Sequence, residues 1–178
     1  MASCFMEWGP LTQFITDAFE GCGIPHEDAA ICTDILLESD RRGIESHGVN
    51  RFKPIYIDRI KAGIQFPVTQ FEVLKETPTT AVVDGHHGMG QVIGYRAMSM
   101  AIAKAKEYGM GMVAVRNSTH YGIAGYYATM ATKDVYKRQP SRRRSWPKLW
   151  RRPPPGCPAC WPPSAVDGSW WTGCPVPL

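Results

Sequence analysis

The sequence predicts an α/β protein in which amino-terminal helices precede a strand–helix–strand unit. Three observations lead to this fold class. Apolar residues recur at helical spacing through the first sixty residues, and two short β-prone runs follow them. The longest helical pattern, 91–108, then lies between the second of these runs and an apolar strand at 110–115. This element order is typical of a parallel sheet covered by helices.

Three helical segments open the chain. Pro10 suits the first turn of the first helix, and Gly21 suits its end. A second helix follows Pro25 and is expected to end near Gly43, and a third runs from about residue 49 to residue 61. The apolar positions that define these helices are Leu11, Phe14, Ile15, Ala18, Phe19, Ala29, Cys32, Ile35, Leu36, Phe52, Ile55, Tyr56 and Ile60.

The α/β unit begins after these helices. Residues 71–74 and 79–83 are the β-prone runs, and residues 85–90 form a glycine-rich turn before the long helix. The residues available for the buried face of the long helix are Val92, Ala97, Met100, Ala101 and Ala105. A last helix begins near Ala124 and stops at Lys133.

Charge and composition change after Lys133. Residues 1–133 carry 12 Lys and Arg against 14 Asp and Glu, whereas residues 134–178 carry 8 against 2. The part from Pro140 onward also holds 10 of the 15 prolines, which remove backbone donors and fix φ. We therefore divide the chain into an α/β part, 1–133, and a Pro/Arg/Trp-rich tail, 134–178.

Three hypotheses account for the tail. The hexapeptide 134–139 can be encoded by GAT GTG TAT AAG AGA CAG, which looks like the transposon end used in sequencing libraries, so the tail is interpreted as a sequencing artefact. The alternatives are a disordered extension and a basic nucleic-acid-binding tail. Cys157, Cys160 and Cys174 give only half of a zinc-ribbon pattern, and chance explains them better than metal binding.

Composition also limits where the protein works. No apolar run reaches about 18 residues, so no membrane-spanning helix is expected. The first seven residues lack the basic start and apolar core of a secretory signal. Cys4, Cys22 and Cys32 are scattered as reduced thiols would be, which favours a cytoplasmic protein.

Two motifs carry candidate catalytic residues. Ser46 and His47 precede the third helix, where Ser46 suits a helix cap, and Arg51 shares a helix face with His47 at a spacing of four. A histidine moves protons near neutral pH and an arginine holds a carboxylate, so the pair suits a small oxo- or hydroxy-acid. The second motif, 117–122, follows the 110–115 strand and contains His120 and Gly122. The alternatives are a capping serine with a packed histidine, and an Asn/Ser/Thr turn with a capping histidine.

The turn 84–90 resembles a dinucleotide-binding fingerprint only in part. Gly88 and Gly90 are followed by Gly94, one residue late, and the next strand ends in Arg116 and Asn117 rather than in an acidic residue. A tight turn is the favoured interpretation. No metal site is predicted, because the adjacent His86 and His87 splay apart and no fourth ligand is evident.

The segments Glu38–Arg51, Glu76–Pro78, Val83–Gly85 and Val113–Tyr127 resemble the malate/L-lactate dehydrogenase family, which is unrelated to the Rossmann lactate dehydrogenases. The resemblance runs from about Phe5 to Lys133. It implies hydride transfer between NAD or NADP and a small 2-oxo or 2-hydroxy acid, in a protein that forms homodimers. It also implies a substrate site at Ser46, His47 and Arg51, with His47 as the acid/base.

The second loop completes what the resemblance implies. His120 matches the family's second active-site histidine, as a supporting or rival acid/base, and with Gly122 it lies on the cofactor side. Family members are about twice as long, so we expect residues 1–133 to be the amino-terminal part of the dehydrogenase domain, without turnover of its own and prone to aggregate. The second function class is a fragment that binds nucleic acid through its basic tail, and the third is a non-enzymatic interaction fragment.

Overall fold

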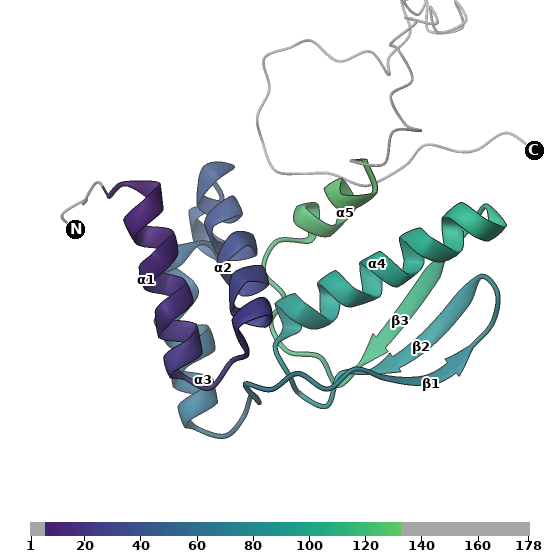
Figure 1. Ribbon diagram of the computed structural model, residues 1–178, viewed down its shortest axis with the longest axis horizontal. Helices are drawn as coiled ribbons and strands as arrows, with labels where there is room; N and C mark the ends of the chain where they lie inside the picture. The colour runs from purple at the N-terminus through teal and green to yellow at the C-terminus, as the bar shows by residue number, and fades with distance from the viewer. Residues whose placement is uncertain (1–5, 133–178) are drawn as a thin grey trace, which may run out of the picture. The chain divides into compact units, whose positions relative to one another are not determined.

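The computed structural model describes residues 6–132, and the tail 134–178 with its cysteines lies outside them (Figure 1). All described residues belong to one compact unit. The helices are α1 (Trp8–Gly21), α2 (His26–Arg41), α3 (Asp58–Lys61), α4 (Gly90–Tyr108) and α5 (Ala124–Thr132). Figure 1 shows α1, α2 and α3 grouped at one end and α4 lying along the sheet at the other.

The sheet has three strands in the order β1 (Glu72–Glu76), β2 (Thr80–Asp84) and β3 (Met112–Arg116). β1 pairs antiparallel with β2, and β2 pairs parallel with β3, so that Val83 lies opposite Val115. Because α4 connects the two parallel strands, the predicted strand–helix–strand unit is confirmed. The strands lie one or two residues later than the sequence patterns indicated.

The core lies mainly among the amino-terminal helices and the start of α4. Phe19 of α1 packs edge-to-face on Phe52 and Tyr56, with ring centroids 4.9 Å and 6.0 Å away. Phe19 and Tyr56 are both fully buried. The helical core therefore fixes the segment that begins at residue 52, and this segment carries part of the candidate site.

The predicted helix 49–61 is wrong in its first half. The chain forms two 3₁₀ turns, Glu45–His47 and Val49–Arg51, then a π-helix, Phe52–Ile57, before α3 begins. Pro54 gives the physical reason, because it has no backbone N–H to donate and its ring crowds the preceding turn. A π-helical turn widens the backbone and is common at functional sites.

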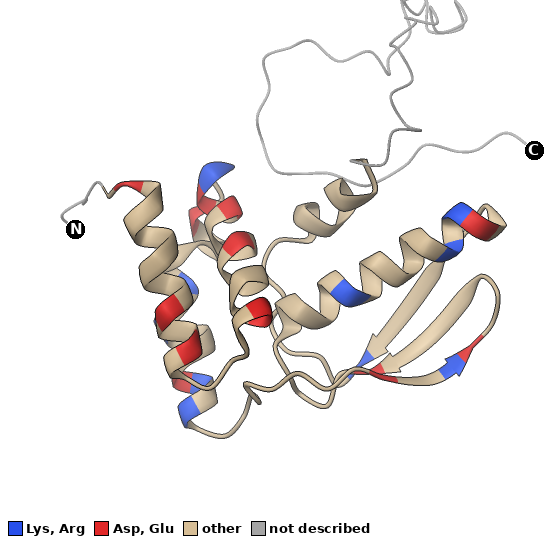
Figure 2. Cartoon of the chain, in the orientation of Figure 1, with Lys and Arg blue, Asp and Glu red and all other residues tan. Residues whose placement is uncertain are grey.

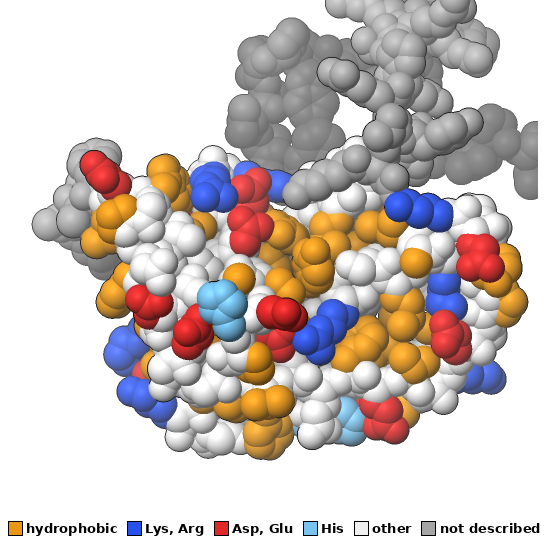
Figure 3. Space-filling model, viewed as in Figure 1, with side chains coloured by type: hydrophobic (Ala, Val, Ile, Leu, Met, Phe, Trp, Pro, Cys, Tyr) orange, Lys and Arg blue, Asp and Glu red, His pale blue; other side chains and the backbone are white. Residues whose placement is uncertain are grey.

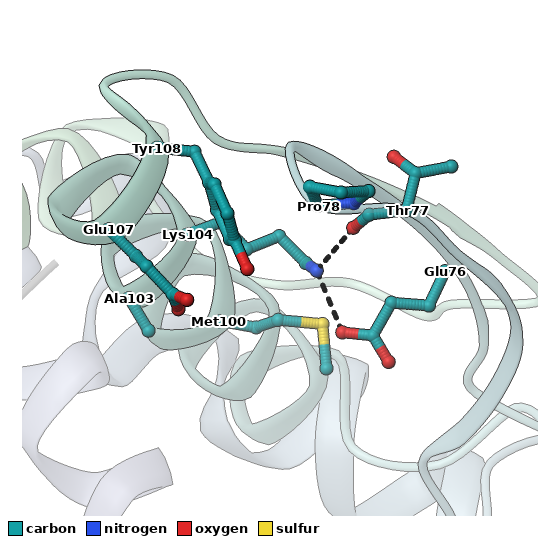
Figure 4. A pocket seen from close by; sticks show the side chains of 8 residues that line it. All are labelled: Glu76, Thr77, Pro78, Met100, Ala103, Lys104, Glu107 and Tyr108. Carbon is teal, nitrogen blue, oxygen red and sulfur yellow. Dashed lines mark hydrogen bonds and ion pairs between the residues drawn. The ribbon is translucent and has the colours of Figure 1, made fainter.

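The buried face of α4 also differs from the prediction. Met100 and its neighbours Ala101 and Ala105 are only half-buried, whereas Lys104 is buried. The Lys104 ammonium donates to Glu76 Oε1 at 2.7 Å and to the Thr77 carbonyl at 2.8 Å (Figure 4). The lysine thus ties α4 to the end of the β1–β2 hairpin, beside a cavity of about 410 Å³.

The surface combines acidic helices with exposed apolar strands. Residues 8–41, which span α1 and α2, contain seven acidic residues and one basic residue (Figure 2). Val73, Val82 and Met112 are exposed on the three strands, and Figure 3 shows further apolar side chains between the charged ones on its face. No helix within residues 6–132 is long and apolar enough to cross a membrane.

Candidate active site

The first half of the site is the pair of 3₁₀ turns after α2. Asp40, near the end of α2, fixes them, because its Oδ2 accepts a hydrogen bond from the Val49 amide at 2.8 Å. Gly48 permits this approach, since a Cβ atom at that position would overlap the Asp40 carboxylate. The two turns are therefore held against the end of α2 by a side chain that contacts backbone.

The turns orient Ser46, His47 and Arg51 in a way that differs from the prediction. Ser46 caps no helix, and its hydroxyl instead lies 2.8 Å from His47 Nδ1. Arg51 Nε donates to the Ser46 carbonyl at 2.6 Å, and the arginine is exposed. His47 and Arg51 lie in successive 3₁₀ turns separated by Gly48, so they share no helix face.

The second half of the site is the loop after β3, and Asp84 at the end of β2 holds it. Its carboxylate accepts hydrogen bonds from the His86 amide at 2.9 Å, Arg116 Nε at 2.6 Å and Asn117 Nδ2 at 2.9 Å. His86 and Asn117 both have positive φ, 45° and 50°. These bonds lower the pKa of Asp84 to about 2, and the bond from the His86 amide has the largest effect. The buried carboxylate therefore stays charged and fixes two strained corners.

Thr119 joins this loop to the start of α4. Its hydroxyl donates to the Gly88 carbonyl at 2.7 Å and accepts from the Gly90 amide at 2.9 Å. A Cβ atom on Gly90 would lie 2.6 Å from the His120 carbonyl, and one on Gly88 would lie 3.0 Å from the Thr69 backbone. Both glycines face protein atoms, so the turn serves packing rather than forming a cradle for phosphate.

The fold brings the two predicted histidines together. The rings of His47 and His120 stack with centroids 5.6 Å apart and planes inclined by 25°. Tyr56 of the π-helix places its hydroxyl 2.9 Å from His120 Nδ1, and the Gly122 amide donates to the same nitrogen at 3.3 Å. Gly122 has a positive φ of 78°, a left-handed conformation that glycine adopts without strain.

The surroundings of His120 disfavour its cationic form. Burial lowers the pKa of His120 most, and the charges of His47, Arg59 and Arg51 lower it further. Burial raises the pKa of Tyr56 far above its usual range, so this phenol keeps its proton. Residues 51–61 carry four basic residues and one acidic residue, which makes this side of the site attractive to an anion.

Tyr56 was missed by sequence reasoning, which placed it on the apolar stripe of a helix. Its ring does pack in the core, as the stripe indicates. A fully buried tyrosine usually needs a hydrogen-bond partner for its hydroxyl, and this requirement was the available indication of a polar role. The partner is His120, 64 residues later in the chain, so spacing could not identify it.

The two adjacent histidines His86 and His87 lie in the turn between β2 and α4. His86 Nε2 contacts Glu72 at 2.7 Å, and no group of three or more His, Cys, Asp or Glu side chains suited to a metal occurs within residues 6–132. A second cavity, of about 340 Å³, lies at this turn. It is lined by Phe66, Val68, Gln70, His86, His87 and Asn117.

The fold and the paired histidines define an α/β protein with a candidate proton-transfer site near Arg51 and Arg59. The chain belongs to the malate/L-lactate dehydrogenase family, whose model matches residues 6–135. It is 47% identical over 119 residues to the L-sulfolactate dehydrogenase of Methanocaldococcus jannaschii, covering 67% of this chain and 34% of that protein. It is 49% identical over 124 residues to the malate dehydrogenase of Pyrococcus horikoshii, covering 70% and 34%.

Solved structures agree with this assignment. The malate dehydrogenase from Entamoeba histolytica superposes with a TM-score of 0.73 at 44% identity, covering 75% of this chain and 37% of that one. The sulfolactate dehydrogenase of M. jannaschii gives a TM-score of 0.69 at 44% identity, covering 71% and 36%. The chain therefore has the fold of these dehydrogenases and spans about a third of the length of the relatives it matches.

Proposed function

We propose that this chain carries the substrate end of an NAD- or NADP-dependent 2-hydroxyacid dehydrogenase. The main observation behind this proposal is the stacked pair His47 and His120, with Arg51 hydrogen-bonded to the 3₁₀ turn that contains His47. Relatives named as malate and sulfolactate dehydrogenases support a small 2-oxo or 2-hydroxy acid as substrate. The nicotinamide, when bound, supplies or accepts the hydride at C2 of that acid.

His47 is the proposed acid/base. When the carbonyl carbon of a 2-oxo acid gains hydride, its oxygen gains negative charge and must receive a proton, which an imidazolium can deliver. The Ser46 hydroxyl beside His47 Nδ1 holds the ring so that Nε2 is left for the substrate. Arg51, in the basic segment 51–61, holds the substrate carboxylate, and this fixes C2 for reaction.

The described residues fit the reacting end of the cofactor better than the rest of it. His120 and Gly122 lie together at one site, which supports the proposal that they face the nicotinamide. The glycine-rich turn 85–90 is not open to a pyrophosphate, since Gly88 and Gly90 are packed on protein atoms. We therefore propose that the 178-residue chain has no turnover by itself. From its family membership we also propose that the active protein is a longer homodimer in the cytoplasm.

The test begins with the gene. Amplification from unfragmented source DNA, followed by sequencing across codons 133–140, shows whether the frame continues into a longer α/β sequence. The extended protein should then oxidise NADH or NADPH with 2-oxo acids, while the 178-residue chain should not. In the extended protein, His47→Asn should lower kcat by about 10²–10⁴-fold. Near-normal turnover in that variant would reject His47 as the acid/base.

A further inference from the structure

The hydrogen bonds around His120 indicate which ring nitrogen carries its proton. Two groups converge on Nδ1, the Tyr56 hydroxyl at 2.9 Å and the Gly122 amide at 3.3 Å. A backbone N–H can only donate, so the nitrogen that faces it must accept. A neutral imidazole has one accepting and one donating nitrogen, and Nδ1 as the acceptor leaves the proton on Nε2.

We propose that Tyr56 and the Gly122 amide lock His120 as the neutral Nε2–H tautomer, so that His120 acts as a hydrogen-bond donor while His47 transfers the proton. Tyr56 is then a positioning residue, because it acts on the reaction through His120. This division of roles rests on the proposed dehydrogenase function, whereas the tautomer itself does not.

The position of Tyr56 makes it suited to this role. Its ring is fully buried against Phe19, and the π-helix 52–57 sets the direction of its hydroxyl. Its ring also meets His120 edge-to-face, with centroids 5.7 Å apart. Because burial keeps the phenol protonated, the Tyr56 O–H remains a donor across the range in which histidines titrate.

The charges that face His120 act in the same direction. His47 and Arg51 approach from the 3₁₀ turns, and Arg59 acts from α3. A proton added at Nδ1 would have to face the Gly122 N–H, which is a donor, and would join three groups that carry or gain positive charge. These contacts favour the neutral form of His120, whereas His47 Nδ1 lies beside the Ser46 hydroxyl, which can donate or accept.

This assignment separates the two histidines chemically. A neutral Nε2–H can polarise a carbonyl oxygen or hold a carboxamide without giving up its proton. His47 can then supply the proton that the substrate oxygen receives, and can take it back in the reverse reaction. The pair therefore contains one fixed donor, His120, and one proposed proton carrier, His47, although the two rings are stacked with centroids 5.6 Å apart.

The test is a long-range ¹H–¹⁵N NMR spectrum of the 178-residue chain labelled at its histidines, recorded above the histidine titration range without cofactor or substrate. His120→Asn identifies the resonances. The expected result is a proton on Nε2 and an Nδ1 resonance displaced by an accepted hydrogen bond. In Tyr56→Phe the Nδ1 resonance should move toward that of a free acceptor nitrogen.

Tyr126→Phe is the matched control. Tyr126 is also buried and donates to a side chain on another element, Asp34 of α2, at 2.6 Å. This variant should leave the His120 resonances unchanged. A wild-type His120 protonated on Nδ1 overturns the proposal, and an unmoved Nδ1 resonance in Tyr56→Phe removes Tyr56 from it. Because the spectrum needs no turnover, failure of the tautomer and failure of the dehydrogenase function are separate outcomes.

Discussion

Gly90→Ala tests whether the start of α4 sets the position of His120. A Cβ atom on Gly90 would lie 2.6 Å from the His120 carbonyl oxygen and closer still to that of Thr119, whereas ordinary contact begins at 3.4 Å. The His120 backbone must therefore move by about 0.8 Å. Overpacking of this kind costs about 1–3 kcal/mol. A displacement near 1 Å can also lower turnover by about 10²-fold in an active enzyme.

Gly9→Ala is the control, because Gly9 lies in the first turn of α1 with nothing within 4 Å of a Cβ atom. Both substitutions bring a similar gain in helix propensity, at most about 1 kcal/mol, so their difference isolates the contact. Circular-dichroism melting should show Gly90→Ala below Gly9→Ala in Tm, by roughly 4 °C per kcal/mol. Equal melting temperatures, with unchanged His120 resonances, would show that the start of α4 does not set the position of His120.

Two further predictions concern titration and reactivity. The pKa of Asp84, about 2 in the fold against 3.8 ordinarily, gives stability that is present above about pH 4 and is lost as pH falls toward about 2. Asp84→Asn should reduce this loss of stability with falling pH in acid unfolding curves. A variant that loses stability as steeply as the wild type would contradict the prediction. Burial raises the pKa of the Cys32 thiol, so alkylation mapped by mass spectrometry should modify half-buried Cys22 before Cys32 in the native protein. Equal labelling rates would exclude a closed core around Cys32.

Much of the fold follows from local patterns. The long helix before residue 109 has an 18-residue periodic pattern, and the glycine after it adopts the left-handed conformation with a φ of 83°. The parallel pairing of β2 and β3 follows from their connection by a helix. The prediction of one helix over 49–61 was wrong because the spacing of apolar residues does not distinguish a continuous α-helix from a π-helical turn followed by a short α-helix.

The candidate site could be predicted only as separate motifs. Residue types and the family resemblance identified His47 and His120, but the 3₁₀ geometry that pairs Ser46 with His47 depends on a contact from Asp40. The role of Tyr56 depends on a contact between its hydroxyl and the loop after β3. Such contacts arise from tertiary packing, for which a single sequence gives no periodic pattern.

The 64-residue separation between Tyr56 and His120 has a consequence for folding. Contact between Tyr56 and His120 requires the β1–β2 hairpin, α4 and β3 to be in place. The histidine pair therefore cannot form in an intermediate that contains only the amino-terminal helices. Contacts of such sequence separation are also among those that slow folding most. Appearance of the Tyr56–His120 hydrogen bond during refolding would therefore report that residues 6–132 have folded completely. During unfolding, local opening at α4 is expected to disrupt the site before the helical core melts.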